Sequence, residues 1–393
     1  GEHVRRWWCR LTDPLAPGLP QRHRQAVAGL VVVCVAWLAV APHASTPAHS
    51  IPPRLSDQAF WRLVSETSEP GGYFSSDNLV SNELTFQWVI PRLQERWTDG
   101  RAYLGVGPEQ NFTYLAALQP SIAFIVDIRP DNLRLQLMYK ALIELSPTRA
   151  EFLSRLLARP RPADLAGGAT PEVMFAAFER TKSSDALFAE TLAAVWRHLT
   201  EQHGFALTAD DKATIEYVLS TFRFAGPGLT YANTGRVGRY PSYQDLMQAR
   251  DRAGQQRSYL ANEALYGRVR SLQLKNLVVP VVGDFSANAV GGAPGALRRV
   301  GEYLKAHQAV VGTIYTSNVE QYLFQYGTWP AYYANVATLP IDERSTFVRS
   351  CFRTCQSIPG SRSTQLLDPV AALLKDIKAG HIRSYYDVLA HSR

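Results

Sequence analysis

Short continuous apolar runs alternate along this chain with longer segments whose apolar residues recur at helical spacing. The runs are typical of buried strands and lie at 101–105, 122–127, 277–285, 309–316 and 345–349. Helical spacing marks segments between them, among them 80–96, 296–306, 319–326 and 330–336. Strands that alternate with helices predict an α/β fold with a mostly parallel sheet covered on both faces.

The stretch from about 146 to 270 has helical patterns only. It is too long for a simple crossover between two parallel strands. The sequence therefore predicts a helical insertion within the α/β domain. A last helix is predicted from Asp368 to about Gly380, with a cap at its start and glycine at its end.

The composition is that of a globular protein, with 46% hydrophobic and 19% charged residues among 393. Such a chain holds one large domain or two smaller ones and buries a sizeable core. The net charge of +7 is mild for this length, and arginines near the N-terminus supply much of it. We therefore predict no nucleic-acid partner.

The N-terminal part divides into a basic region (1–25), an uncharged apolar segment (26–41) and a linker rich in Pro, Ser, Ala and His (42–57). The apolar segment is short for a spanning helix and fits an export signal or single anchor, with a buried core helix as the alternative. We expect the domain at 58–393 outside the cytoplasm, in a bacterial periplasm, with membrane contact only through this segment. If the segment is not native, a cytoplasmic location follows.

Cysteines and histidines give no pattern of metal ligands. Cys351 and Cys355 are separated by three residues, and no second pair completes four zinc ligands. They form a local disulfide in an oxidising compartment or pack as small hydrophobic side chains. His198 and His203 lie on a predicted helix, where a separation of five places them on diverging faces. We therefore predict surface histidines and no metal site.

Polar residues and glycines follow four of the predicted strands. Gly105 and Gly107 form a turn after the first strand, and Asp127 ends the second. Gly283-Asp284 ends the third, and the fourth ends in Ser317-Asn318-Val-Glu320. In an open parallel sheet, ligands bind outside the carboxyl ends of strands where the strand order reverses. The spacing of the glycine turn and Asp127 makes a nucleoside-type ligand the leading hypothesis, although Asp127 and Asp284 could equally cap local turns.

With these residues, the stretch 78–350 resembles the class I S-adenosylmethionine-dependent methyltransferases. The resemblance implies a Rossmann-like, mostly parallel sheet of the class I methyltransferase type with a long helical insertion, and S-adenosylmethionine as cofactor. It assigns Gly105, Gly107 and Glu109 to the first cofactor-binding motif, Asp127 to the ribose hydroxyls and Asp284 with Gly283 to the surroundings of adenine. Ser317, Asn318 and Glu320 would lie beside the transferred methyl group and the acceptor.

The chain also resembles an uncharacterised bacterial protein family that carries Ser76-Asp-Asn-Leu and Ser317-Asn-Val-Glu-Gln-Tyr322. It departs from the methyltransferase pattern at two places in the first motif. Tyr103 replaces an acid that helps to hold the ligand's amino group, and Glu109 replaces the third glycine. Glu109 could instead meet the sulfonium or the amino group from a new direction.

Methyl transfer requires alignment of the acceptor and, for some acceptors, removal of a proton. Glu320, Asn318 and Tyr322 are the predicted catalytic residues, and Glu83 and Asp77 are further candidates for the proton acceptor. The sequence thus predicts a possible methyltransferase with a small-molecule or peptide acceptor. Two alternatives stay open: a non-catalytic exported protein that binds a nucleoside-like or other polar ligand, and an interaction protein that uses the helical insertion. The oligomeric state is not predicted.

Overall fold

A six-stranded sheet organises the computed structural model, which describes residues 50–231, 240–352, 355 and 361–392. Its strands are β1 (Ala102–Gly105), β2 (Ile122–Asp127), β3 (Val278–Val282), β6 (Val311–Ser317), β7 (Thr346–Phe352) and β8 (Ser363–Pro369). Their order is β3-β2-β1-β6-β7-β8, and β8 alone among them runs antiparallel to its neighbour. This is the strand order of a doubly wound sheet, so the fold is Rossmann-like and the predicted α/β class is confirmed.

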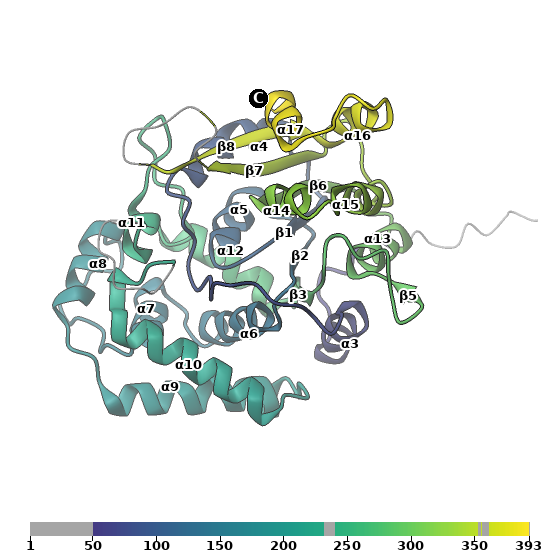
Figure 1. Ribbon diagram of the computed structural model, residues 1–393. Helices are drawn as coiled ribbons and strands as arrows, with labels where there is room; N and C mark the ends of the chain where they lie inside the picture. The colour runs from purple at the N-terminus through teal and green to yellow at the C-terminus, as the bar shows by residue number, and fades with distance from the viewer. Residues whose placement is uncertain (1–49, 232–239, 353–354, 356–360, 393) are drawn as a thin grey trace, which may run out of the picture. The chain divides into compact units, whose positions relative to one another are not determined.

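Helices cover both faces of this sheet (Figure 1). One face carries α4 (Ile90–Arg96), α5 (Gln110–Leu118), α6 (Pro130–Glu144) and α12 (Glu263–Leu274). The other carries α3 (Asp57–Thr67), α13 (Ala296–Ala306), α14 (Val319–Gln325) and α15 (Trp329–Val336). Since both faces are covered, β1, β2 and β3 are buried at every position, which explains their continuous apolar sequences.

The predicted helical insertion separates β2 from β3. After α6 it contains α7 (Arg149–Leu157), α8 (Pro171–Arg180), α9 (Asp185–Arg197), η2 (His198–Gln202), α10 (Ala209–Ala225), η3 (Gly226–Gly228) and α11 (Tyr243–Gln248), and it ends with α12. Thr148 and Thr208 begin α7 and α10 with capping boxes, as the spacing of their acids predicts. Figure 1 shows α7 to α11 at one side of the sheet, below its β7–β8 edge.

Two segments differ from the sequence prediction. The helix expected from residue 80 begins only at η1 (Phe86–Val89). It is split into η1 and α4, which has Pro91 in its first turn. The tail helix expected from Asp368 begins at α16 (Val370–Lys378), because Asp368 belongs to β8, which the sequence analysis missed. The chain continues to α17 (Tyr385–His391). A short hairpin, β4 (Ala289–Val290) and β5 (Ala293–Pro294), precedes α13.

The predicted divergence of His198 and His203 is wrong. Residues 198–202 form a π-helix, in which the amide of His203 donates to the carbonyl of His198 over 3.0 Å. An i→i+5 turn brings residues five apart onto the same side. The two ring Nε2 atoms are consequently 3.2 Å apart.

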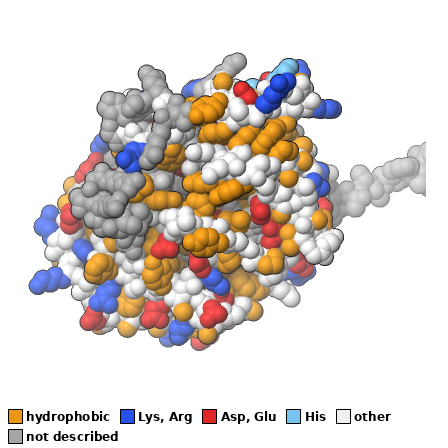
Figure 2. All heavy atoms as spheres, viewed as in Figure 1, with side chains coloured by type: hydrophobic (Ala, Val, Ile, Leu, Met, Phe, Trp, Pro, Cys, Tyr) orange, Lys and Arg blue, Asp and Glu red, His pale blue; other side chains and the backbone are white. Residues whose placement is uncertain are grey.

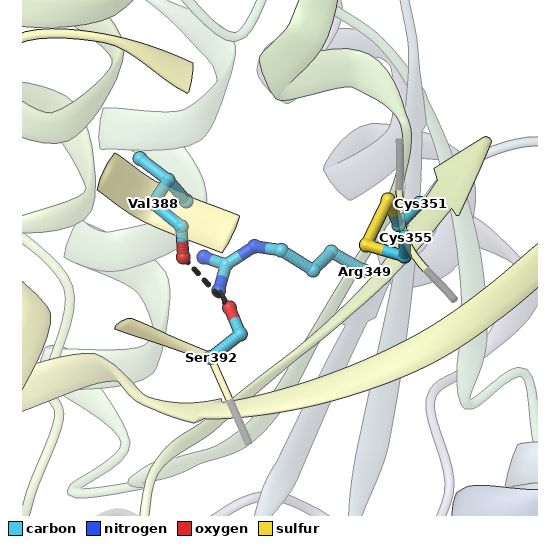
Figure 3. Close-up of a disulfide and its surroundings, with 5 residues drawn as sticks. All are labelled: Arg349, Cys351, Cys355, Val388 and Ser392. Carbon is cyan, nitrogen blue, oxygen red and sulfur yellow. Dashed lines mark hydrogen bonds between the residues drawn. A yellow bond between two sulfur atoms is a disulfide. The ribbon is translucent and has the colours of Figure 1, made fainter. Parts of the chain in front are cut away.

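A buried ionic network joins the antiparallel edge of the sheet to α14 and the C-terminal helices. Arg349 on β7 donates to both oxygens of Glu320, at 2.6 and 3.0 Å, and to Asp368 on β8 at 2.6 Å. Each of the three side chains is at most 1% exposed. Arg349 also donates to the Ser392 hydroxyl, which in turn donates to the carbonyl of Val388 in α17 (Figure 3).

Cys351 and Cys355 form a disulfide in the same region (Figure 3). Of the two states that the sequence left open, the structure shows the bonded one.

Among the described residues, no helix has the length and the hydropathy to cross a bilayer. The predicted segments at 1–25 and 26–41, and the linker up to residue 49, lie outside the described residues. On the face shown in Figure 2, Lys and Arg side chains are spread around the margin instead of gathering in one patch.

Replacing Arg349 by Met should lower the free energy of unfolding by about 3–5 kcal/mol, because Glu320 and Asp368 would stay buried without their partner. Urea unfolding followed by circular dichroism measures the change. Arg344→Met, an exposed change just before β7, is the control and should stay within about 0.5 kcal/mol of the parent. A loss below about 1 kcal/mol for Arg349→Met would show that the network does not hold this edge together.

Candidate functional site

A cavity of about 660 Å³ lies at the carboxyl ends of the central parallel strands. Its volume is within the usual range for small-molecule sites. Strands β1 and β6 are neighbours, but β1 leads into α5 on one face and β6 leads into α14 on the other. A crevice forms where the chain leaves adjacent strands in opposite directions, and this is where ligands bind in doubly wound sheets.

Most of the strand-end residues singled out in the sequence border this cavity. They are Gly107, Asp127, Asp284, Ser317, Asn318 and Tyr322. Gly107 has φ +80°, a left-handed conformation that favours glycine, and its turn brings the backbone after β1 to the cavity wall. Segments more than 100 residues apart in sequence thus meet at one site.

Gly105 and Gly283 do not border the cavity, and their close contacts are with the protein itself. A Cβ on Gly105 would lie 2.7 Å from the Tyr103 ring and closer still to the Asn111 side chain. A Cβ on Gly283 would collide with Ala296 at the start of α13. Glycine is therefore needed at both positions for packing between a strand and the following helix.

Glu109 and Glu320 are also behind the cavity wall. Glu320 is 1% exposed, holds Arg349 and accepts a 2.7 Å hydrogen bond from the Tyr333 hydroxyl. Its carboxylate is therefore committed to the ionic network. Glu109 is fully buried, and one of its oxygens accepts from the Ser81 amide while the other has no partner among the described residues. Burial raises the pKa of Glu109 to about 8, and the Ser81 hydrogen bond offsets this only in part.

Asp127 is in the cavity wall but is already paired. Its two oxygens accept from the Arg129 guanidinium at 3.0 and 2.9 Å, and one also accepts from the Arg129 amide. Arg129 donates in addition to the carbonyls of Ser76 and Asp77, which fixes the loop that borders the cavity. A carboxylate offers about four lone-pair sites, so one site of Asp127 is left for a ligand hydroxyl.

Glu83, in the segment before η1, is a buried acid in the cavity wall. It is 1% exposed, accepts from the Ser317 hydroxyl at 2.5 Å, and its other oxygen accepts from Gln365 at 3.3 Å. Burial raises the pKa of Glu83, and the hydrogen bonds from Ser317 and its neighbours oppose that rise. A raised pKa brings proton exchange nearer to neutral pH, as a general base requires. Asp77, the other candidate before β1, accepts instead from Tyr217 on α10.

Aromatic and cationic side chains complete the wall. Phe74 and Tyr322 meet edge to face with ring centroids 5.4 Å apart, and Arg362 lies 5.8 Å from the Tyr240 ring. Sequence analysis missed Phe74 and Arg362, because neither belongs to a strand end or a recognisable motif. The one available signal was the glycine-rich segment that precedes Phe74. Aromatic faces attract cations, and arginines bind carboxylates or phosphates.

The arrangement fits S-adenosylmethionine in part. Asp127 retains one acceptor site for a ribose hydroxyl, and aromatic rings are available to a sulfonium. The first motif fits less well, since the Tyr103 hydroxyl is buried and donates to Asn111 at 2.8 Å rather than facing the cavity. Arg129 is paired with Asp127, so Arg362 is the arginine in the wall that could hold the carboxylate of the ligand's amino-acid part.

One protein-family model matches the chain, over residues 78–206 and 209–367, and its description is "Domain of unknown function (DUF7790)". The match includes β1 to β7, the insertion and every strand-end residue of the site. A comparison with curated proteins found no match.

Stability should fall as pH rises from about 5 to about 8, in part because of Glu109. Its folded-state pKa of about 8 is above the ordinary glutamate value of 4.5, so in this window the unfolded chain releases a proton that the folded chain retains. The stability that Glu109 contributes is fully present below the unfolded-state pKa and is lost as pH rises through the folded-state pKa. Between these two pKa values the free energy of unfolding falls by up to about 1.4 kcal/mol per pH unit.

Urea unfolding of Glu109→Gln at several pH values tests this assignment. The variant should lose less stability than the parent between pH 5 and pH 8. Glu95→Gln, an exposed change on α4, should keep the parent's pH dependence. Identical slopes for the parent and Glu109→Gln would contradict the assignment.

Proposed function

The chain belongs to the family described as a domain of unknown function (DUF7790), and from its site we propose that it binds S-adenosylmethionine and transfers the methyl group to a small-molecule or peptide acceptor. One observation carries the proposal. Gly107, Asp127 and Asp284, with Ser317 and Asn318, surround a single cavity where the strand order reverses. The resemblance to class I methyltransferases assigns ligand contacts to these same positions.

Each part of the ligand has a partner in this proposal. Asp127 accepts from a ribose hydroxyl, and Asp284, which caps the Ser286 amide over 2.8 Å, lies beside the adenine. The sulfonium lies near Glu83 and the rings of Phe74 and Tyr322, since carboxyl groups and aromatic faces both stabilise a cation.

Methyl transfer requires alignment of the acceptor with the methyl group and a group that accepts a proton. The sulfonium supplies a reactive methyl group when it is bound, so the protein has to orient the acceptor against it. Glu83 takes the role of proton acceptor in place of Glu320, because Glu320 is sealed behind the cavity wall by Arg349. Ser317 and Asn318 orient the acceptor from the end of β6.

A second candidate is an exported protein that binds a phosphate-bearing nucleoside without turnover. Arg362 borders the cavity and favours an anionic group. The disulfide between Cys351 and Cys355 favours an oxidising compartment, in which S-adenosylmethionine is not expected. Adenosine monophosphate is therefore the probe that separates this candidate from the methyltransferase.

Calorimetric titration of the full chain tests ligand choice. S-adenosylmethionine and S-adenosylhomocysteine should bind with micromolar affinity, and Asp127→Asn should weaken both at least tenfold, because an amino group replaces one of the two acceptor oxygens. Asp131→Asn, at the exposed start of α6, is the matched control and should leave the affinity unchanged. Tight binding of adenosine monophosphate alone would support the second candidate. Binding of none of the three by folded protein would overturn both.

Glu83→Gln tests the position of the sulfonium. S-adenosylmethionine carries a positive charge that S-adenosylhomocysteine lacks, so loss of the Glu83 carboxyl should lower the affinity for the first about tenfold relative to the second. Glu343→Gln, an exposed change before β7, should preserve the ratio of the two affinities. Equal losses for both ligands would place the sulfonium away from Glu83.

A further inference from the structure

Three potential metal ligands converge at a place remote from the cavity. Glu144 is the last residue of α6, and His198 and His203 lie at the two ends of the π-helix η2. One oxygen of Glu144, Oε2, lies 2.6 Å from Nε2 of each histidine. None of the three residues borders the cavity. They form a group in which every ligand atom is within 4.8 Å of the others.

Hydrogen bonds from outside the trio fix how the two rings are oriented. Nδ1 of His203 lies 2.7 Å from the Asp57 carboxylate, and Nδ1 of His198 contacts the side-chain oxygen of Gln202. A carboxylate only accepts, so Nδ1 of His203 carries a proton towards Asp57, whereas the Gln202 amide can turn its oxygen or its nitrogen towards Nδ1 of His198. In both rings the Nε2 atom points at Glu144 and at the other ring. This is the arrangement by which outer carboxylates and amides orient metal-bound histidines.

The carboxylate is held in the same way. Its other oxygen, Oε1, accepts from Lys140 at 2.6 Å, and Lys140 also donates to Asn276. Asn276 donates to Asp57 at 2.8 Å, which closes the network around the trio.

The two rings crowd one carboxylate oxygen. Both Nε2 atoms approach Oε2 of Glu144, and they are 3.2 Å from one another. One divalent ion between these three atoms turns all of them into ligands. The side chains are at most 13% exposed, so a cation there would be largely shielded from water.

We propose that Glu144, His198 and His203 bind one divalent transition-metal ion of the zinc type, with water as the fourth ligand. Two imidazoles and a carboxylate are a ligand set that suits zinc. Usual zinc bond lengths would spread the three ligand atoms to roughly 3.3 Å from one another, a small movement for side chains. The ion would join the α9–η2 end of the insertion to α6 and, through Asp57, to α3.

This proposal also accounts for the π-helix. A regular α-helix would carry His198 and His203 on diverging faces, whereas the i→i+5 turn brings both Nε2 atoms to Glu144. Single π turns of this kind are frequent at functional sites. Since an ion binds the folded chain and not the unfolded one, it should also stabilise the protein.

Zinc titration of the full chain, first stripped with a chelator, tests the site. The parent should bind one ion that the double variant His198→Gln/His203→Gln does not bind, and zinc should raise the melting temperature of the parent alone. Asp57→Asn should weaken the affinity about 10–100-fold, as changes to outer partners do. His381→Gln, which alters a histidine whose side chain is 69% exposed, is the matched control and should bind as the parent does.

Two results would overturn the proposal: equal zinc binding by the parent and the double variant, or no zinc binding by the parent. X-ray absorption of the zinc-loaded parent keeps the test decisive if the double variant does not fold. A shell of nitrogen and oxygen ligands with two imidazoles supports the site. A shell that contains sulfur would place the ion elsewhere and overturn it.

Discussion

The reversal of strand order between β1 and β6 is the constraint on which the rest of this structure depends. Both strands run in the same direction and are buried, so their chains have to leave at the same edge. Right-handed connections then send α5 to one face and α14 to the other. The backbone cannot fill the gap between them, and side chains from segments far apart in the sequence surround it.

Buried acids on the two sides of this crevice differ in whether an arginine neutralises them. Towards the antiparallel edge, Arg349 neutralises Glu320 and Asp368 in a site without water access. Towards the cavity, the described residues offer Glu83 and Glu109 no cationic partner of this kind, and burial raises the pKa of both. Such unpaired acids cost stability, and groups with shifted pKa values are often found where a protein acts on a ligand. The difference explains why Glu83, and not Glu320, is the acid available for chemistry.

The insertion depends on a second set of polar contacts, at the far end of α6. Lys140, Glu144 and Asn276 connect this helix to Asp57 at the start of α3 and to the π-helix. The network is nearly buried, so its members have to satisfy one another. The site there and the cavity have no residue in common, and the structure therefore supports two separate proposals.

The sequence by itself determined the α/β class, the parallel strands and the insertion, because a strand buried on both faces has to be continuously apolar and capping boxes act locally. It also placed Gly107, Asp127 and Ser317 at strand ends that meet.

Only the tertiary structure decided which acids are held in ion pairs, since the pairing of Asp127 with Arg129 and of Glu320 with Arg349 depends on side-chain direction and burial. It alone showed β8 beside β7, and it alone brought His198 and His203 together. A helical pattern of apolar residues does not distinguish an α turn from a π turn. An α turn joins residues four apart and a π turn joins residues five apart, and only the π turn brings the two rings together.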